Sequence, residues 1–308
     1  MNSEKLIILG HINPDVDSII SGLLLEYYIN NNTSYKAEFV IPDQKLDNDT
    51  ISICNRFSIP FFKHQRDLTT ADKKIILVDH FERDLENKEI VAIIDHHPTS
   101  KIVKTPFYVN EKISSTALLI VEGREEFFSK ELLKLAILAT YVDTASFNSI
   151  KARDEDKIWA EHLCNKYNFD KEQFYEVGLM LTDLTNLEAA AFTGLKKYNI
   201  KSRNIEVSSL QINGKDNNKE KLDKIKDIII DYFIKNELDV FVLIIHDMSK
   251  MKSSAFKIFK DGIEIVEYDQ YTSRGNIIIP ELEKELIKHN FEINKIKEKV
   301  KLKKQSKF

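Results

Sequence analysis

The chain has 308 residues, of which 43% are hydrophobic and 31% charged, a composition typical of a folded protein and unlike that of a disordered one. Its formal net charge of -4 argues against a general nucleic-acid-binding protein, so no nucleic-acid partner is expected. A chain of this length is too long for one ordinary core, and we expect two domains.

The N-terminus and the cysteines indicate a cytoplasmic protein. A strand-like run begins directly after residues 1–5, without the long apolar region of a signal peptide. No run approaches the roughly eighteen apolar residues of a membrane span, so we expect no membrane partner. Cys54 and Cys164 fit a reducing compartment and lack the spacing of a zinc site. The lysine-rich residues 294–308 are interpreted as a solvated helix end and tail.

In the first half of the chain, short apolar runs alternate with segments of helical periodicity. Strands this apolar, with helices between them, indicate a parallel sheet with helices on both faces. The fold class of this half is therefore α/β. The expected elements are strands at 6–9, 36–41, 73–80 and 89–97 and helices at 17–31 and near 49–57.

From Ser114 to about Leu184 the sequence is helical, because apolar residues recur three and four positions apart. Ser129 and Asp154 stand where the N-caps of two of these helices are expected. These helices should cover the sheet. A helix-prone connector follows at 185–195, and we place the domain boundary there.

The residues beyond the connector predict a smaller α/β domain. Some of its strands are joined by short polar turns instead of helices, which is typical of a mixed sheet. The expected elements are strands at 203–212, 239–247, 254–262 and 262–269 and helices at 219–236 and near 280–290.

Acidic and imidazole side chains follow several strands of the first half. The carboxyl ends of parallel strands meet at one edge of a sheet, so these side chains should lie together there. Each has an ordinary explanation when taken alone, and Asp17 in particular would serve as the N-cap of the next helix. Their recurrence at separate strand ends favours a joint metal site. The candidates are His11, Asp15, Asp17, Asp79, His80, Asp95, His96, His97 and Asp143.

This mixture of carboxylates and imidazoles, without a thiolate, suits Mn²⁺ or Mg²⁺, or Co²⁺ or Fe²⁺, better than structural zinc or copper. Five or more anionic groups exceed what one divalent ion requires. Two ions about 3.5–4 Å apart, sharing bridging carboxylates, would use them all and would hold a hydroxide as nucleophile. Attack on phosphorus is the reaction that such a site most often supports.

The order of these motifs resembles that of the DHH phosphoesterase superfamily. The motifs are "GHINPDVDS" (10–18), "VDH" (78–80), "DHH" (95–97) followed by "SSTA" (114–117), and "VDT" (142–144). Together with the second domain, they resemble the family II, manganese-dependent inorganic pyrophosphatases over nearly the whole chain. The resemblance implies a DHH metal-binding catalytic domain at 1–184, a helical hinge at 185–195 and a DHHA2 substrate-binding domain at 196–308.

The resemblance also implies roles for single residues. Six would bind two metal ions: His11 and Asp15 the first, Asp17, His96 and Asp143 the second, and Asp79 both. The second histidine of "DHH", His97, would contact substrate phosphate. The ions would be two Mn²⁺, with Co²⁺ or Mg²⁺ possible, and an additional Mg²⁺ would arrive with the substrate. Whether His80 or His97 protonates the leaving phosphate stays open.

Two basic residues of the second domain complete the resemblance. The segment 195–207 aligns without a gap to the family segment that bears a substrate lysine, which falls on Lys196. The segment 272–280 resembles the family's Ser-Arg-Lys segment and places the phosphate-binding arginine at Arg274, in a loop whose backbone could also approach a phosphate. Gly275 stands where the family has a second lysine.

The function that the resemblance implies is hydrolysis of inorganic pyrophosphate to two phosphates. An exopolyphosphatase, or another DHH-family phosphoanhydride or phosphoester hydrolase, is the alternative, and Gly275 favours it. A non-enzymatic phosphate sensor is a third hypothesis, opposed by the complete set of candidate ligands. The resemblance further implies a homodimer built from the sheet edges of the N-terminal domains, with the connector acting as a hinge.

Overall fold

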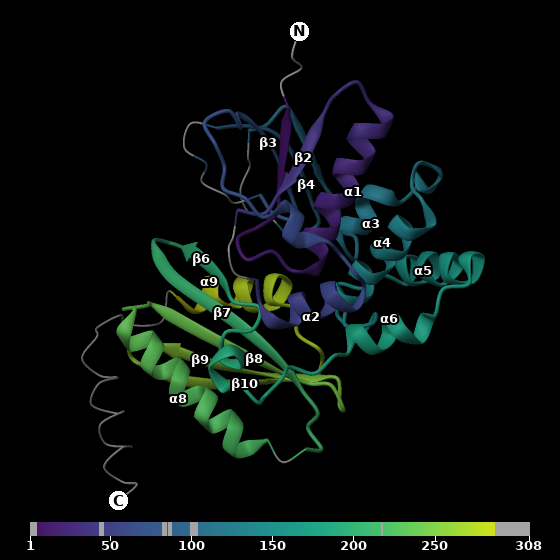
Figure 1. Ribbon diagram of the computed structural model, residues 1–308. Helices are drawn as coiled ribbons and strands as arrows, with labels where there is room; N and C mark the ends of the chain where they lie inside the picture. Colours follow the sequence, from purple (N-terminus) through teal and green to yellow (C-terminus); the bar gives the residue numbers. More distant parts are fainter. Residues whose placement is uncertain are drawn as a thin grey trace, which may run out of the picture. The chain divides into compact units, whose positions relative to one another are not determined.

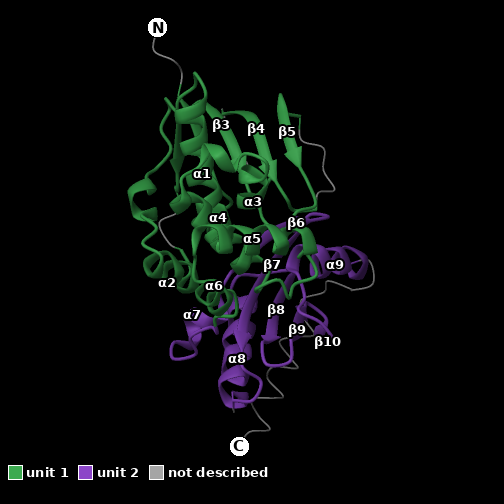
Figure 2. Cartoon of the chain, turned by 90° about the vertical axis from the view of Figure 1, so that its right-hand side faces the viewer, with its two compact units in different colours: residues 1–180 green, residues 181–308 purple. Residues whose placement is uncertain are grey.

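The computed structural model describes residues 5–42, 46–81, 85, 88–98, 104–216 and 218–286. The predicted tail at 294–308 and the end of the helix predicted near 280–290 lie outside these ranges. The chain divides into two compact units, residues 1–180 and 181–308 (Figure 2). None of the helices in the described ranges combines the length and the apolar character that a membrane span requires.

The first unit is built on a sheet of five parallel strands in the order β2-β1-β3-β4-β5, as the α/β prediction required. Figure 1 labels β2, β3 and β4 of this sheet. The strand β5 was not predicted, because it has only four residues, "FYVN", and the first two of them are exposed. The strands are β1 (Leu6–Leu9), β2 (Ala37–Val40), β3 (Lys74–Val78), β4 (Glu89–Asp95) and β5 (Phe107–Asn110).

The strand order reverses its direction between β1 and β3. The chain moves from β1 outward to β2, and later from β3 outward through β4 to β5. In doubly wound sheets of this order, the crevice beyond the carboxyl ends of the two central strands is the usual place for a ligand. His11 and Asp79 lie within two residues of the ends of these strands, so the topology brings them to one crevice.

The described helices of this unit pack against one face of the sheet and against each other, whereas helices were predicted on both faces. Gly22 of α1 shows how closely they pack, because a Cβ atom at this position would lie 2.2 Å from the Phe39 ring of β2. The opposite face, which includes Ile7 and Leu77, packs with residues of connecting segments such as Leu68 and Phe81. The helices are α1 (Val16–Asn32), α2 (Asn48–Arg56), α3 (Thr116–Val121), α4 (Lys130–Asp143), α5 (Asp154–Tyr167) and α6 (Lys171–Gly178), with short 3-10 turns η1 (Phe61–His64) and η2 (Glu125–Phe127).

Of the two N-caps predicted between Ser114 and Leu184, Ser129 is confirmed and Asp154 is wrong. The side chain of Ser129 caps α4 by accepting a hydrogen bond from the backbone N–H of Leu132. Asp154 is instead the first residue of α5, after an N-cap at Arg153 that makes no side-chain capping bond. The negative charge of Asp154 still lies in the first turn, where it interacts favourably with the helix dipole.

The second unit contains the predicted mixed sheet, in the order β10-β9-β8-β7-β6. Only β7 and β8 pair in parallel. The strand β6 was not predicted, because "KKYNI" is mostly polar and its side chains are at most half-buried. The strands are β6 (Lys196–Ile200), β7 (Arg203–Ile212), β8 (Val240–Asp247), β9 (Lys252–Phe259) and β10 (Gly262–Tyr268).

Helices cover both faces of this mixed sheet. The helix α8 (Lys219–Lys235) and the short α7 (Leu187–Ala191), which lies in the predicted connector, share one apolar cluster with the sheet. A π-helical turn, η3 (Arg274–Ile278), continues into α9 (Ile279–Glu285) on the other face. Arg274 therefore begins a helical turn, and the expectation that it lies in a loop is wrong.

Candidate metal centre

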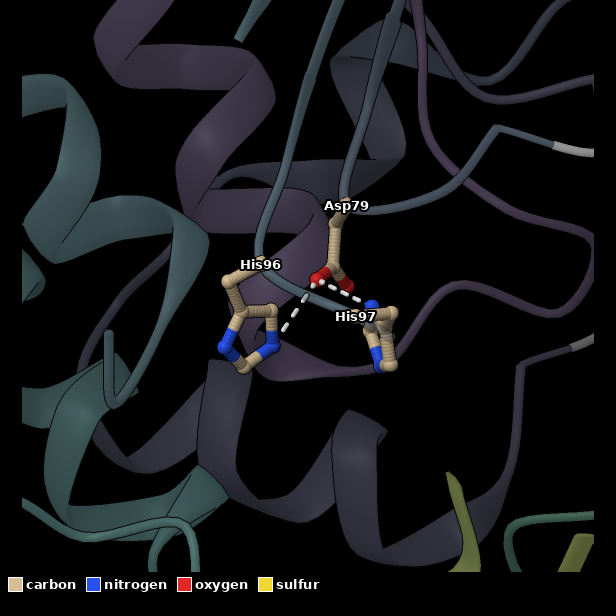
Figure 3. A group of neighbouring side chains, drawn as sticks. All are labelled: Asp79, His96 and His97. Carbon is tan, nitrogen blue, oxygen red and sulfur yellow. Dashed lines mark ion pairs between the residues drawn. The ribbon is translucent and has the colours of Figure 1, made fainter. Parts of the chain in front are cut away.

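Carboxylates and imidazoles from β1, β3, β4, α1 and α4 converge at one place in the first unit. They form three overlapping groups, in each of which one ligand atom per residue lies within 4.8 Å of the others. Asp79 belongs to two of the groups, and Figure 3 shows its carboxylate facing the rings of His96 and His97. The groups are His11, Asp15 and Asp79; Asp17, His96 and Asp143; and Asp79, His96 and His97.

The two oxygens of the Asp79 carboxylate face different histidines. Oδ2 lies 3.5 Å from Nε2 of His11, and Oδ1 lies 3.5 Å from Nε2 of His96. The residue is buried, and its backbone has a φ of 63°, a left-handed conformation that aspartate adopts more readily than most residues. The Thr116 hydroxyl, 3.1 Å from Oδ1, donates a hydrogen bond that fixes the carboxylate. Asp79 is thus oriented between the two groups.

The first group is assembled by the loop after β1. Asp15 is the N-cap of α1, and its Oδ1 accepts a hydrogen bond from the N–H of Ser18. Its other oxygen, Oδ2, lies 3.2 Å from Nε2 of His11. One carboxylate therefore caps the helix and also faces the candidate site.

Asp17 does not cap the helix, so that prediction is wrong. Its position in the first turn of α1 is buried, and its carboxylate accepts hydrogen bonds from the N–H groups of Thr116 and Ala117 at 2.8 and 2.9 Å. These two amides open α3. Asp17 Oδ2 lies 3.9 Å from Nε2 of His96, which in turn lies 3.4 Å from Asp143 Oδ2 at the end of α4.

The tautomers of His11 and His96 provide a test of whether this cluster fits a cation. Nδ1 of each ring lies 2.9 Å from a backbone carbonyl, that of Ile12 or Ile113, and must donate to it. In the neutral imidazole, Nε2 then carries the lone pair, and in both rings this atom is buried without a hydrogen-bond partner in the described part of the chain. Lone pairs that face carboxylate oxygens repel them, and a cation between them removes the repulsion. The residues fit divalent metal ions.

Burial controls the charges in the centre. Desolvation, followed by the repulsion of Asp143 and Asp15, raises the pKa of Asp17 to about 7. Desolvation, with a further contribution from His97, lowers the pKa of His96 to about 4. Burial alone would raise the pKa of Asp143, but the charges of Lys151 and then His96 lower it. At neutral pH His96 is thus a neutral imidazole, and Asp143 is ionised.

Metal binding should therefore release a proton in a pH-dependent way. At pH 6 the carboxyl of Asp17, with its pKa of about 7, still holds its proton in the metal-free protein and must lose it to bind a cation, whereas His96 is already neutral. We expect calorimetry in buffers of different ionisation heat to give about one proton released on Mn²⁺ binding at pH 6 and far fewer at pH 8. Equal proton release at both pH values would contradict this account of Asp17.

Asp95 and His80 lie next to the centre but belong to none of the three groups. The Asp95 carboxylate is buried, and its Oδ1 accepts hydrogen bonds from the N–H of His96 and from Nδ1 of His97, at 2.8 and 2.9 Å. Asp95 therefore orients His97, whose side chain is 29% exposed. The ring of His80 donates through Nδ1 to the carbonyl of Val78 and meets the His11 ring edge-on, 6.4 Å between centroids.

Two residues of the centre were not recognised in the sequence as candidates. Thr116 fixes both Asp17 and Asp79, and the motif "SSTA" that contains it was the available signal. Lys151 forms an ion pair with Asp143 from a loop eight residues further on. Nothing in "NSIKARD" distinguishes this lysine from the other basic residues of the chain.

In the second unit, Lys196 and Arg274 both lie beside Val207 of β7. Lys196 pairs with Val207 across the β6–β7 ladder. The guanidinium of Arg274 donates to the carbonyl of Val207 at 3.5 Å, and also to the carbonyl of Gly194. Ser273 caps the turn that begins at Arg274, because its hydroxyl accepts from the N–H of Asn276. Two cationic side chains far apart in the sequence thus come to one strand.

The fold and the cluster define a two-unit α/β protein with a carboxylate and imidazole centre of the kind that binds divalent metal ions. Residues 5–140 match the model of the DHH family, N-terminal domain. The matched segment lies within the first unit, which therefore resembles the N-terminal domain of the DHH family.

Known relatives extend the similarity over both units. The chain is 25% identical over 292 residues to the manganese-dependent inorganic pyrophosphatase of Bacillus subtilis, covering 89% of this chain and 92% of the relative. It is 26% identical over 310 residues to the manganese-dependent inorganic pyrophosphatase of Methanothrix thermoacetophila, covering 91% and 98%. Its fold matches a crystal structure described as a family II inorganic pyrophosphatase of Methanococcus jannaschii, with a TM-score of 0.73, 23% identity and coverage of 91% and 98%.

Proposed function

We propose that the protein is a manganese-dependent inorganic pyrophosphatase that converts pyrophosphate and water to two phosphates. The observation that carries this proposal is the orientation of Asp79, whose two carboxylate oxygens face two different ligand groups at 3.5 Å. The names of the relatives, which cover about nine-tenths of the chain, support the same activity.

The proposed ligand sets follow the geometric groups. His11, Asp15 and Asp79 would hold one Mn²⁺, and Asp17, His96 and Asp143, with the second oxygen of Asp79, the other. Paired divalent cations supply a water of lowered pKa at neutral pH and stabilise the charge that develops on phosphate oxygens. Two of these ligands are held in position by hydrogen bonds: the Thr116 hydroxyl donates to Asp79, and the first two amides of α3 donate to Asp17.

His97 is the residue that we propose to contact substrate phosphate from the first unit. Asp95 accepts from its Nδ1, so the other ring nitrogen, Nε2, lies on the side of the ring away from Asp95. Protonated at Nε2, the ring could donate to a phosphate oxygen and stabilise the leaving phosphate. Lys196 and Arg274 would bind the second phosphate, which requires the two units to close on the substrate about the connector at 185–195.

A substrate comparison tests the proposal. Purified protein with Mn²⁺ is offered pyrophosphate, polyphosphate, linear dinucleotides and nucleotides side by side, and phosphate release or product formation is measured. We expect kcat/KM for pyrophosphate to exceed that for each of the other compounds by at least about a hundredfold. The reason is that its two phosphates match two sets of positive charge, the metal ions and the pair Lys196 and Arg274. Turnover of pyrophosphate no better than that of the other compounds would refute the proposed substrate.

The polyphosphate alternative rests on Gly275. A lysine lost from a phosphate site removes a charge-assisted contact worth on the order of 1.5–3 kcal/mol, and the space it leaves could accept a longer phosphate chain. In the same comparison, a kcat/KM for polyphosphate above that for pyrophosphate would assign the protein to this alternative.

Arg274 provides a separate test in the second unit. We expect Arg274→Lys to raise KM or lower kcat for pyrophosphate by roughly tenfold to a hundredfold, because lysine lacks the two-pronged geometry of the guanidinium. Binding of Mn²⁺ should be unchanged, since the proposed metal ligands lie in the first unit. Arg203→Lys is a matched control from the same unit, and steady-state kinetics of both variants should separate them.

We also propose that the protein is cytoplasmic and forms a homodimer, and that an additional Mg²⁺ enters with the substrate. The two cysteines are both buried and unpaired, as a reducing compartment favours. The sheet of the first unit ends in β2 on one side and β5 on the other, and such edges can pair between chains. Light scattering of the purified protein measures the oligomeric state directly.

A further inference from the structure

One lysine reaches into the candidate metal centre. The ammonium group of Lys151 binds Oδ2 of Asp143, and both side chains are only 18% exposed. This same oxygen lies 3.4 Å from Nε2 of His96. The atom that faces the rest of the Asp17, His96 and Asp143 group is therefore also the one that holds the lysine.

The loop between Asp143 and Lys151 holds the lysine in this position. After α4 ends, Ala145, Ser146 and Phe147 take left-handed φ values of 48°, 55° and 62°, which turn the chain back sharply. The hydroxyl of Ser146 donates to the carbonyl of Tyr175 at 2.7 Å and ties the turn to α6. The N–H of Ser149 donates to the carbonyl of Thr144 at 2.9 Å and closes it. Lys151 is thus delivered to the centre by a well-bonded loop.

The charge of Lys151 acts on the whole second group. Its ammonium group neutralises one of several carboxylates that lie close together, namely Asp15, Asp17, Asp79 and Asp143. A positive charge held at Asp143 Oδ2, 3.4 Å from Nε2 of His96, repels a divalent cation that would bind these same atoms.

We propose that Lys151 is an internal cation that competes with the divalent metal for Asp143 and thereby weakens metal binding by the Asp17, His96 and Asp143 group. In the metal-free centre this ammonium group reduces the repulsion between the carboxylates. A metal ion that binds Asp143 Oδ2 must break the ion pair between this oxygen and Lys151. The inference rests on the metal centre of the proposed function and is independent of its substrate.

The test is a Mn²⁺ titration of the full-length, chelator-stripped protein, in which the electron paramagnetic resonance signal of free Mn²⁺ reports binding. Lys151→Met removes the charge and keeps the side-chain length. A unit charge within about 4–6 Å changes the proton affinity of a group by roughly ten- to a thousandfold, so we expect at least one Mn²⁺ to bind ten times more tightly or better. Lys151→Arg should stay within about threefold of the unchanged protein, because the charge is kept.

Lys171→Met is the matched control. Lys171 also forms an ion pair in the first unit, with Glu161 at 2.8 Å, but both partners are substantially exposed. Lys171→Met should leave Mn²⁺ affinity unchanged.

The lysine and the metal ion compete for one oxygen of Asp143. Lys151→Met should therefore change Mn²⁺ affinity much less in an Asp143→Asn background. Lys151→Gln repeats the test if the methionine variant does not fold.

Unchanged or weaker Mn²⁺ binding in Lys151→Met or Lys151→Gln would overturn the inference, since the lysine would then support the ligand Asp143 instead of competing for it. Failure of the unsubstituted protein to bind Mn²⁺ would instead refute the metal centre of the proposed function. The two failures are therefore distinguishable in one titration series.

Discussion

Replacing Asp79 with asparagine is expected to lower the rate of pyrophosphate hydrolysis by about three powers of ten. The carboxylate has one oxygen toward each of the two ligand groups, and an amide can offer only one oxygen and no negative charge. Both metal positions should lose affinity, and a bound metal ion typically supplies several kcal/mol of transition-state stabilisation, where about 1.4 kcal/mol is a factor of ten. Steady-state kinetics at saturating Mn²⁺ measures the loss.

Asp47→Asn is a suitable control for this change. Asp47 is the N-cap of α2 and lies outside the three ligand groups, and asparagine is an equally good N-cap. The control should retain full activity. A loss of less than tenfold in Asp79→Asn would mean that the two ligand groups do not depend on one shared carboxylate.

Removing metal should abolish turnover and also lower the stability of the protein. Asp17 and Asp79 are buried beside other acidic side chains, and Nε2 atoms of neighbouring histidines lie 3.5–3.9 Å from their carboxylate oxygens. We expect dialysis against a chelator to reduce pyrophosphate hydrolysis at least about a hundredfold, and Mn²⁺ to restore it. Ligand binding to the folded state at a hundred times Kd adds about 2.7 kcal/mol of stability.

Thermal unfolding with and without Mn²⁺ measures this second effect. The unfolding midpoint should rise with Mn²⁺ concentration and should rise far less in Asp79→Asn. Full activity after exhaustive chelation, with elemental analysis showing no residual metal, would contradict the account.

Much of the first unit could be predicted because burial imposes a simple pattern on its strands. The runs at β1, β3 and β4 are apolar enough to specify a parallel sheet, and the residues after them must then share its carboxyl edge. The strands β5 and β6 could not be predicted, since they lie at sheet edges and expose much of their surface.

Within the candidate site, the sequence indicated which side chains gather but not how each is held. Asp17 looked like an N-cap because it precedes an apolar helix, yet Asp15 caps that helix and Asp17 accepts from amides about a hundred residues away. Lys151 carries no local signal, because its contact with Asp143 depends on the left-handed turn after α4. Long-range hydrogen bonds and turns of this kind depend on tertiary structure. The metal-binding roles themselves stay predictions.

Anomalous diffraction from crystals grown with Mn²⁺, recorded on both sides of the manganese absorption edge, tests the central claim most directly. The account predicts two manganese peaks about 3.5–4 Å apart, with Asp79 contacting both. One peak should also contact His11 and Asp15, and the other Asp17, His96 and Asp143. A map without manganese at this cluster, or with a single ion that Asp79 does not contact, would contradict it.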